Sequence, residues 1–199
     1  MPRPARLVLP LLLLTGACSL FGRGGAGSSA ATAPAPNASS ASAATPGLTD
    51  ANIAAIVVAA NKADILYADL AMAKSQDAEV RAFATMVKLD HESINEAAVA
   101  LVTRLKVTPV DNQISFDIRD DAETKRLVFR DLEGFAFDSA YAANEVSYHT
   151  SVLGAIDKAL IPSARNAELR DLLVQARPAV AAHLEHATAM AAKKTVRRR

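Results

Sequence analysis

Apolar residues recur at intervals of three and four positions along nearly the whole chain from Leu48 onward. This spacing places them on one face of an α-helix, and no segment shows the alternation that is typical of a β-strand. Thr49 is a favourable N-cap for a first helix to about Ala73, and Asp77 is one for a second helix to about Leu105. The pattern therefore predicts two long amphipathic helices that are joined by a tight turn.

The second half of the chain predicts two more long helices after a longer connection. Within this connection we expect a shorter helix over residues 120–132, which Gly134 ends. A third main helix is expected over residues 137–160, where Pro162 stops it, and a last helical region is expected over residues 164–192.

These elements indicate an all-α chain, organised as an up-down four-helix bundle with a longer connection between the second and third main helices. Pro178 must kink the last helical region or divide it in two. Trp is absent and aromatic residues are only 5% of the chain. Such a composition suits helices that pack closely through small side chains.

The first residues have the organisation of a secretory signal peptide. Arg3 and Arg6 precede an apolar run over residues 7–14, and small residues follow it. The string from Leu14 to Cys18 resembles the lipobox of bacterial lipoproteins, with Thr15 where that motif most often has Leu. We therefore expect cleavage before Cys18 and lipidation of this cysteine with fatty acids such as palmitate. An ordinary signal peptide and an uncleaved short anchor are the alternatives.

Composition predicts the organisation of the rest of the chain. Residues 18–47 are almost entirely Ala, Ser, Gly, Pro and Thr, which indicates a disordered tether after the signal peptide of residues 1–17. Residues 48–192 form the helical bundle domain, and residues 193–199 form a basic, solvated tail. Ser19 after the cysteine resembles proteins sorted to the outer membrane, so we expect an outer-membrane lipoprotein that faces the periplasm.

Charge and cysteine content limit the partners. The net charge is +1, but all 21 acidic side chains lie within residues 49–192 and outnumber the basic ones there. Affinity for nucleic acid comes mainly from neutralising phosphates, so this acidic body excludes nucleic acid as a partner. Cys18 is the only cysteine, so stability must come from a packed core rather than from a disulfide. The expected partners are the membrane, through the lipid, and an unknown protein or small ligand.

Four polar residues stand among the apolar positions, one on each predicted long helix: Asp64, His91, His149 and His183. At a rise of about 1.5 Å per residue, the first three lie roughly 17 to 21 Å from the turns that join their helices, and His183 lies about 30 Å from its turn. Imidazoles and a carboxylate that meet inside a bundle form a candidate transition-metal site.

The alternative is a buried hydrogen-bond network in which each imidazole donates to a carboxylate such as Asp90, Asp138 or Glu145. His186 follows His183 by three positions, so these two side chains are also a candidate pair for one ion.

Three separated stretches carry a resemblance to a known family: residues 82–91, residues 137–141 followed by Val146 and His149, and Pro178 followed by His183, Leu184 and Ala187. In this order they resemble the domain-of-unknown-function family 4142, over about residues 48–190. The resemblance implies a ferritin-like four-helix fold and an exported or outer-membrane location. It implies no established activity.

The chain departs from the di-iron pattern of ferritin-like proteins. That pattern needs Glu-x-x-His on two helices, whereas the residues three before the predicted ligands are Lys88, Val146 and Val180. No nucleophilic triad or phosphate-binding loop is present either. We expect a non-enzymatic, lipid-anchored cell-envelope protein that binds a partner or acts in envelope stress. The alternative is a metal-binding or redox bundle that uses Asp64 and the three histidines.

Overall fold

The computed structural model describes residues 47–197, and all the regular elements in this range are helices. The all-α prediction is thereby confirmed for this range. The predicted signal peptide, Cys18 and the tether up to residue 46 lie outside the described residues. Over the described range, no helix has the length and apolar character needed to cross a membrane.

The first two helices begin where their N-cap residues predict. α1 (Asp50–Lys74) follows Thr49, whose hydroxyl accepts from the backbone N–H of Asn52 in a capping box. α2 (Ala78–Leu105) follows Asp77, whose carboxylate accepts from two backbone N–H groups of the first turn. Each N-cap defines the start of its helix because it satisfies donors that the first turn leaves unpaired. The tight turn between the helices therefore lies between Ser75, whose N–H donates to the Ala71 carbonyl at the end of α1, and the cap residue Asp77.

The connection between the second and third long helices is itself a helix, longer than predicted. α3 (Gln113–Arg130) begins before residue 120 because Asn112 and Ser115 form a capping box there. Gly134 does not end α3. It is instead the first residue of α4 (Gly134–Ala155), with a φ of 53°, a conformation that residues with a Cβ rarely adopt.

α4 continues without a break into a π-helical turn, η1 (Ile156–Leu160), and a last short turn, α5 (Ile161–Ser163). Pro162 lies inside that last turn, so the helical segment ends slightly later than predicted.

α6 (Ala167–Arg197) is one helix that contains Pro178, so the proline does not divide it. The helix also continues past residue 192. Lys193 and Lys194 therefore belong to α6 rather than to a solvated tail, and both pair with carboxylates at the start of α2.

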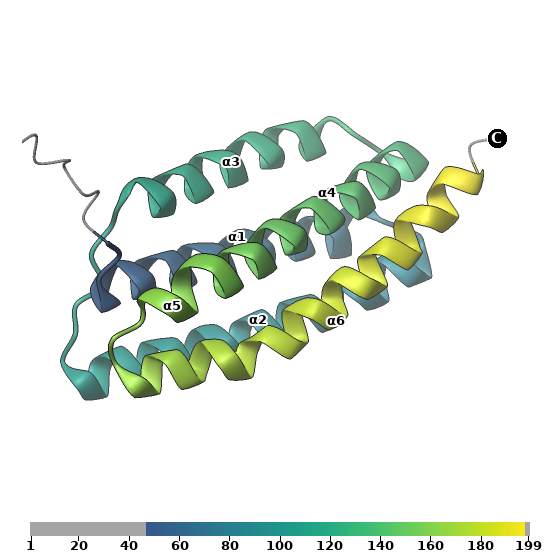
Figure 1. Ribbon diagram of the computed structural model, residues 1–199. Helices are drawn as coiled ribbons and strands as arrows, with labels where there is room; N and C mark the ends of the chain where they lie inside the picture. Colours follow the sequence, from purple (N-terminus) through teal and green to yellow (C-terminus); the bar gives the residue numbers. More distant parts are fainter. Residues whose placement is uncertain (1–46, 198–199) are drawn as a thin grey trace, which may run out of the picture. The chain divides into compact units, whose positions relative to one another are not determined.

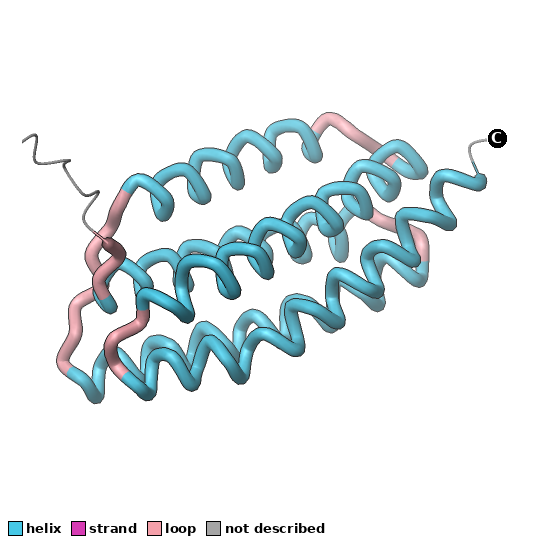
Figure 2. The backbone as a smooth tube through the Cα atoms, in the orientation of Figure 1, coloured by secondary structure: helices cyan, strands magenta, loops and turns pink. Residues whose placement is uncertain are grey.

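The four long helices pack as two antiparallel pairs (Figure 1). α1 packs most extensively on α2, and α4 on α6, while contacts between α2 and α6 and between α1 and α4 join the pairs. α3 packs on α1 and has few contacts with α4. The chain can be followed in Figure 2: α1, α3 and α6 run in one direction, and α2 and α4 run in the other. Among the four long helices, α2 and α4 therefore run in the same direction, because α3 returns the chain to the other end of the bundle before α4 begins. The four long helices thus do not follow a strict up-down order.

Two apolar clusters form the core of the described bundle. One is rich in aromatic rings and contains Tyr67, Phe83, Phe129, Phe137, Tyr141 and Met190. The other is aliphatic and contains Ile53, Ile56, Leu101, Ile156, Leu169 and Leu173. On each long helix, buried polar residues lie between the two clusters. A polar layer is therefore enclosed midway along the bundle.

Asp77 has two separable roles, as the N-cap of α2 and as the partner of Lys194. We expect Asp77→Ala to lower the free energy of unfolding by about 1 to 2 kcal/mol through loss of the cap. Asp77→Asn keeps the cap and should lose less. Urea denaturation of the three chains at neutral pH measures this difference, and equal losses in the two variants would contradict the capping role.

The bond from Lys194 lowers the pKa of Asp77 below its usual value. A carboxyl with a lowered folded-state pKa stabilises the fold above its unfolded pKa, and this stability is lost as the pH falls through the folded pKa. The stability difference between wild type and Asp77→Asn should therefore shrink in acid. Denaturation curves of both chains, recorded from neutral pH into acid, test whether the stability difference shrinks as the pH falls.

Candidate metal centre

The polar layer contains all four predicted site residues. Asp64 comes from α1, His91 from α2, His149 from α4 and His183 from α6, and each is at most 3% exposed. The centroids of the three imidazole rings lie 5.2, 5.4 and 5.8 Å apart. Side chains from four helices thus meet at one place.

His183 is level with the others, which corrects the predicted depth of about 30 Å. Residues 164–166 form the turn, so α6 begins only at Ala167 and His183 lies roughly 24 Å along it. His149 lies roughly 21 Å before the end of α5. The predicted depth is too large because residues 164–166 connect α5 and α6 and are not part of a helix.

Asp64 contacts two of the imidazoles. Its Oδ2 atom lies 2.9 Å from His91 Nε2 and 3.2 Å from His149 Nε2. Burial alone raises the pKa of Asp64, but the contacts with His149 and His91 outweigh burial and hold this pKa well below its usual range. Asp64 is therefore charged at neutral pH, and a buried charge requires a compensating partner.

Each imidazole is oriented by one ring nitrogen that faces an oxygen acceptor. These contacts are His91 Nδ1 to Asn61 Oδ1 at 2.7 Å, His149 Nδ1 to the Glu145 carbonyl oxygen at 3.0 Å, and His183 Nε2 to Asp90 Oδ2 at 2.8 Å. Because the oxygens accept, these nitrogens donate, and the second nitrogen of each neutral ring carries a lone pair. Burial also lowers the pKa of His183, which favours its neutral form.

The second nitrogens are His91 Nε2, His149 Nε2 and His183 Nδ1, and they have no hydrogen-bond partner among the described residues. One ligand atom from each of the three rings lies within 4.8 Å of the others. Both carboxylate oxygens of Asp64 also lack a hydrogen-bond partner within this range. Buried polar atoms are nearly always partnered, so a concentration of unpartnered ones needs a physical explanation.

Glu145, predicted only as a hydrogen-bond partner, also belongs to the cluster. Its Oε2 lies 3.5 Å from His149 Nδ1, and Asp64, Glu145 and His149 form a second group of ligand atoms within 4.8 Å of one another. Burial and the nearby charge of Asp64 raise the pKa of Glu145 well above its usual value. Glu145 precedes His149 by four residues, which places both side chains on the same buried face of α4. This spacing is the sequence signal that identifies Glu145 as a site residue.

Two other predicted candidates lie outside the cluster. Asp138 accepts from Ser75 Oγ at 2.5 Å rather than from an imidazole. His186 packs edge-on against Phe83, with ring centroids 5.0 Å apart, and is in neither group of close ligand atoms found among residues 47–197. No group of three or more close ligand atoms in this range therefore contains both His183 and His186.

Two arrangements of charge fit the cluster. In a hydrogen-bond network, a proton on His91 or His149 faces Asp64. In a metal site, a cation lies between the lone pairs. Neighbouring ligands of a metal with bonds of about 2.0 to 2.1 Å lie about 2.9 to 3.4 Å apart. The contacts of 2.9 and 3.2 Å between Asp64 and the two imidazoles have this length, which is also the length of a hydrogen bond, so both arrangements fit them.

These features define a helical bundle with a buried cluster of histidines and carboxylates. Within this class the chain belongs to the family DUF4142, a domain of unknown function, whose family model matches residues 33–190. The resemblance to this family is thereby confirmed. No curated protein and no solved structure matches the chain.

We expect the imidazoles of the cluster to differ in tautomer when a divalent cation is bound. His91 and His149 should then carry the proton on Nδ1, and His183 should carry it on Nε2, because those nitrogens face oxygen acceptors. Long-range proton–nitrogen correlation spectra of the zinc-loaded chain measure this, with His186 as an internal reference. A proton on Nε2 of His91 or His149 would indicate donation to Asp64 and support the network instead.

Proposed function

We propose that the bundle binds a first-row divalent transition metal through His91 Nε2, His149 Nε2 and His183 Nδ1, with Asp64 as a carboxylate ligand. One observation carries this proposal: each ring is held through one nitrogen and has a second nitrogen without a hydrogen-bond partner, and one nitrogen from each ring lies within 4.8 Å of the others. Metal-binding histidines are usually held in this way, by a carboxylate or carbonyl oxygen on the outer nitrogen.

The donor set indicates the kind of metal. Imidazole nitrogen suits zinc, copper, iron and nickel, whereas calcium and magnesium prefer sites made of oxygen. A bound divalent cation favours the ionised form of Glu145 against the burial that raises its pKa, so that Asp64 and Glu145 together would balance the charge of the ion. The apolar clusters on both sides of the layer limit access of water and keep the ligands in place.

We also propose a ferritin-like topology for the four long helices. In that topology one long crossover connection joins two antiparallel helix pairs. The position of α3 supports this, because α3 lies between α2 and α4 in the sequence and packs on α1. The Glu-x-x-His spacing of di-iron bundles is missing at His91, His149 and His183. We therefore propose metal binding and not ferroxidase activity.

The metal proposal is tested on the full-length chain, purified without chelator. We expect elemental mass spectrometry to detect a bound first-row transition metal. After the metal is stripped, the melting temperature should rise again when zinc, copper or iron(II) is added. A ligand at one hundred times its Kd stabilises the folded state by about 2.7 kcal/mol, which a thermal melt detects.

The matched variants are His91→Ala and His186→Ala. Both remove an imidazole that packs in the bundle, but only His91 belongs to the cluster. His91→Ala should lower the metal-free stability by about 1 to 3 kcal/mol, because it opens a cavity and leaves Asp64 less well partnered. It should also abolish the metal-dependent rise, which His186→Ala should keep. A wild-type melt that no metal moves, or equal rises in the two variants, would refute the metal site and leave the network.

We further propose that Cys18 is lipidated and holds the bundle at the outer membrane, facing the periplasm, where the protein serves a binding or envelope-stress role. The signal-peptide pattern of residues 1–17 and the Ser19 that follows the cysteine support this location. Cys18→Ser should lose palmitate incorporation and partitioning into a detergent phase. Metabolic labelling and fractionation of a Gram-negative host measure both. Undiminished labelling of Cys18→Ser would contradict lipidation at this residue.

A further inference from the structure

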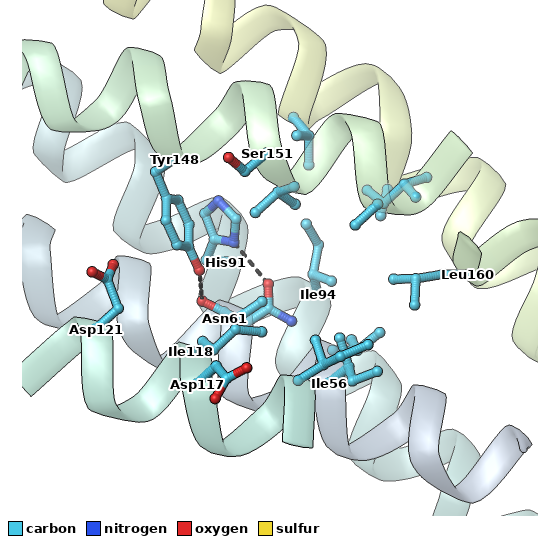
Figure 3. Close-up of a pocket in the computed structure, with 18 of the residues that line it drawn as sticks. Ile56, Asn61, His91, Ile94, Asp117, Ile118, Asp121, Tyr148, Ser151 and Leu160 are labelled. Carbon is cyan, nitrogen blue, oxygen red and sulfur yellow. Dashed lines mark hydrogen bonds between the residues drawn. The ribbon is translucent and has the colours of Figure 1, made fainter. Parts of the chain in front are cut away.

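A cavity of about 460 Å³ lies beside the histidine cluster. Its walls come mainly from α1, α3 and α4, and α2, η1 and α6 complete them. Figure 3 shows the labelled side chains around it. Since α3 packs on α1 and has few contacts with α4, exposed residues of α3 and α4 border the cavity. Small-molecule sites typically have volumes of about 300 to 1,000 Å³, so this cavity is of a suitable size.

The walls are aliphatic inside and polar at the border. The aliphatic part includes Ile56, Ile94, Ile118, Val152, Ile156 and Leu160. The border carries Asp117, Asp121 and Lys125 from α3 and Ser147 and Ser151 from α4. Binding of an occupant with an apolar body is favourable here, because its apolar surface and that of the cavity walls are both removed from water.

The π-helical turn η1 lines this same cavity through Ile156 and Leu160. Such turns are rare and occur frequently at functional sites. It is the one π-helical segment among residues 47–197, and it lies where the third long helix passes the cavity.

Two amide groups in the cavity wall have unused donors. Asn61 Oδ1 accepts a hydrogen bond from His91 Nδ1, and Asn61 Nδ2 has no hydrogen bond among the described residues. Asn144 Nδ2 is buried and likewise lacks a well-aligned hydrogen bond in that range, although the Asn144 side chain also lies against the Glu145 carboxyl group. The Tyr148 hydroxyl, by contrast, already donates to the Ala60 carbonyl at 2.6 Å. An occupant that satisfies the amides must therefore offer an acceptor.

We propose that this cavity binds an uncharged, mainly apolar molecule with an oxygen acceptor, of the class of long-chain alcohols, esters or ketones. The alkyl chain of the occupant fills the aliphatic part of the cavity, and its oxygen accepts a hydrogen bond from Asn61 or Asn144. At about 30 Å³ for each non-hydrogen atom, the volume holds an occupant of about fifteen such atoms. A carboxylate head is disfavoured, because Asp117 and Asp121 outnumber Lys125 at the border.

The cavity and the histidine cluster are separate sites with one shared wall. His91 lines the cavity, and its Nδ1 faces Asn61 while its Nε2 faces Asp64. An occupant that bonds Asn61 therefore leaves the proposed metal ligands in place. The cavity proposal stands without the metal, and each of the two can fail alone.

The test uses the full-length chain with Cys18→Ser, purified without detergent, because a detergent molecule would itself enter an apolar cavity. N-phenylnaphthylamine, an uncharged fluorophore, reports occupancy. We expect saturable binding of about one probe per chain and displacement by dodecanol. Dodecanoate should be about tenfold weaker because of its charge, and chlorododecane about fivefold weaker because it lacks the oxygen acceptor.

The matched variants lie on α4. Ala155→Phe places a ring in the cavity and should weaken probe binding about tenfold or more, whereas Ala143→Phe, at an exposed position outside the cavity, should not. Both should keep the zinc-dependent rise in melting temperature, which separates this proposal from the metal site. Should Ala155→Phe not fold, methyl resonances of Ile118 and Ile156 in the Cys18→Ser chain should shift on titration with dodecanol.

Three results would overturn the proposal. The first is the absence of saturable probe binding, or unmoved methyl resonances at saturating dodecanol. The second is equal probe affinity in Ala155→Phe and Ala143→Phe. The third is displacement by dodecanoate or chlorododecane as strong as that by dodecanol.

Discussion

The contact of the buried Asp64 carboxylate with the imidazoles of His91 and His149 is the constraint on which the rest of the bundle depends. A charge that leaves water destabilises the fold unless its partners compensate for it. Here the partners come from two other helices, so the registers of α1, α2 and α4 are fixed at one level. The aromatic and aliphatic clusters pack on either side of this layer.

Local chemistry determines the parts of the structure that the sequence predicts well. Thr49 and Asp77 cap the helices where expected, and helical periodicity places Asp64 on a buried face. The direction of α4 is not a local property, because it depends on the length and packing of α3. Glu145 and Asn61 were not predicted as site residues, because a polar side chain on a helix has the same local pattern whether it meets solvent or a neighbouring helix.

His91 links the two candidate sites. One ring nitrogen faces Asn61 at the cavity wall, and the other faces Asp64 in the cluster. The lone pair that a metal requires on Nε2 therefore depends on the acceptor that Asn61 offers to Nδ1. The Nδ2 atom of the same amide is available to donate a hydrogen bond to an occupant of the cavity. One hydrogen bond thus lies between the proposed metal-binding layer and the proposed apolar ligand site.

The central claim is that three imidazoles direct their lone pairs at one cation. X-ray absorption of the zinc-loaded, full-length chain tests it most directly, because the scattering of imidazole rings differs from that of isolated oxygen ligands. The account predicts zinc bound by three imidazole nitrogens at about 2.0 to 2.1 Å, together with carboxylate oxygen. Zinc bound by oxygen alone, or by a single imidazole, would contradict it.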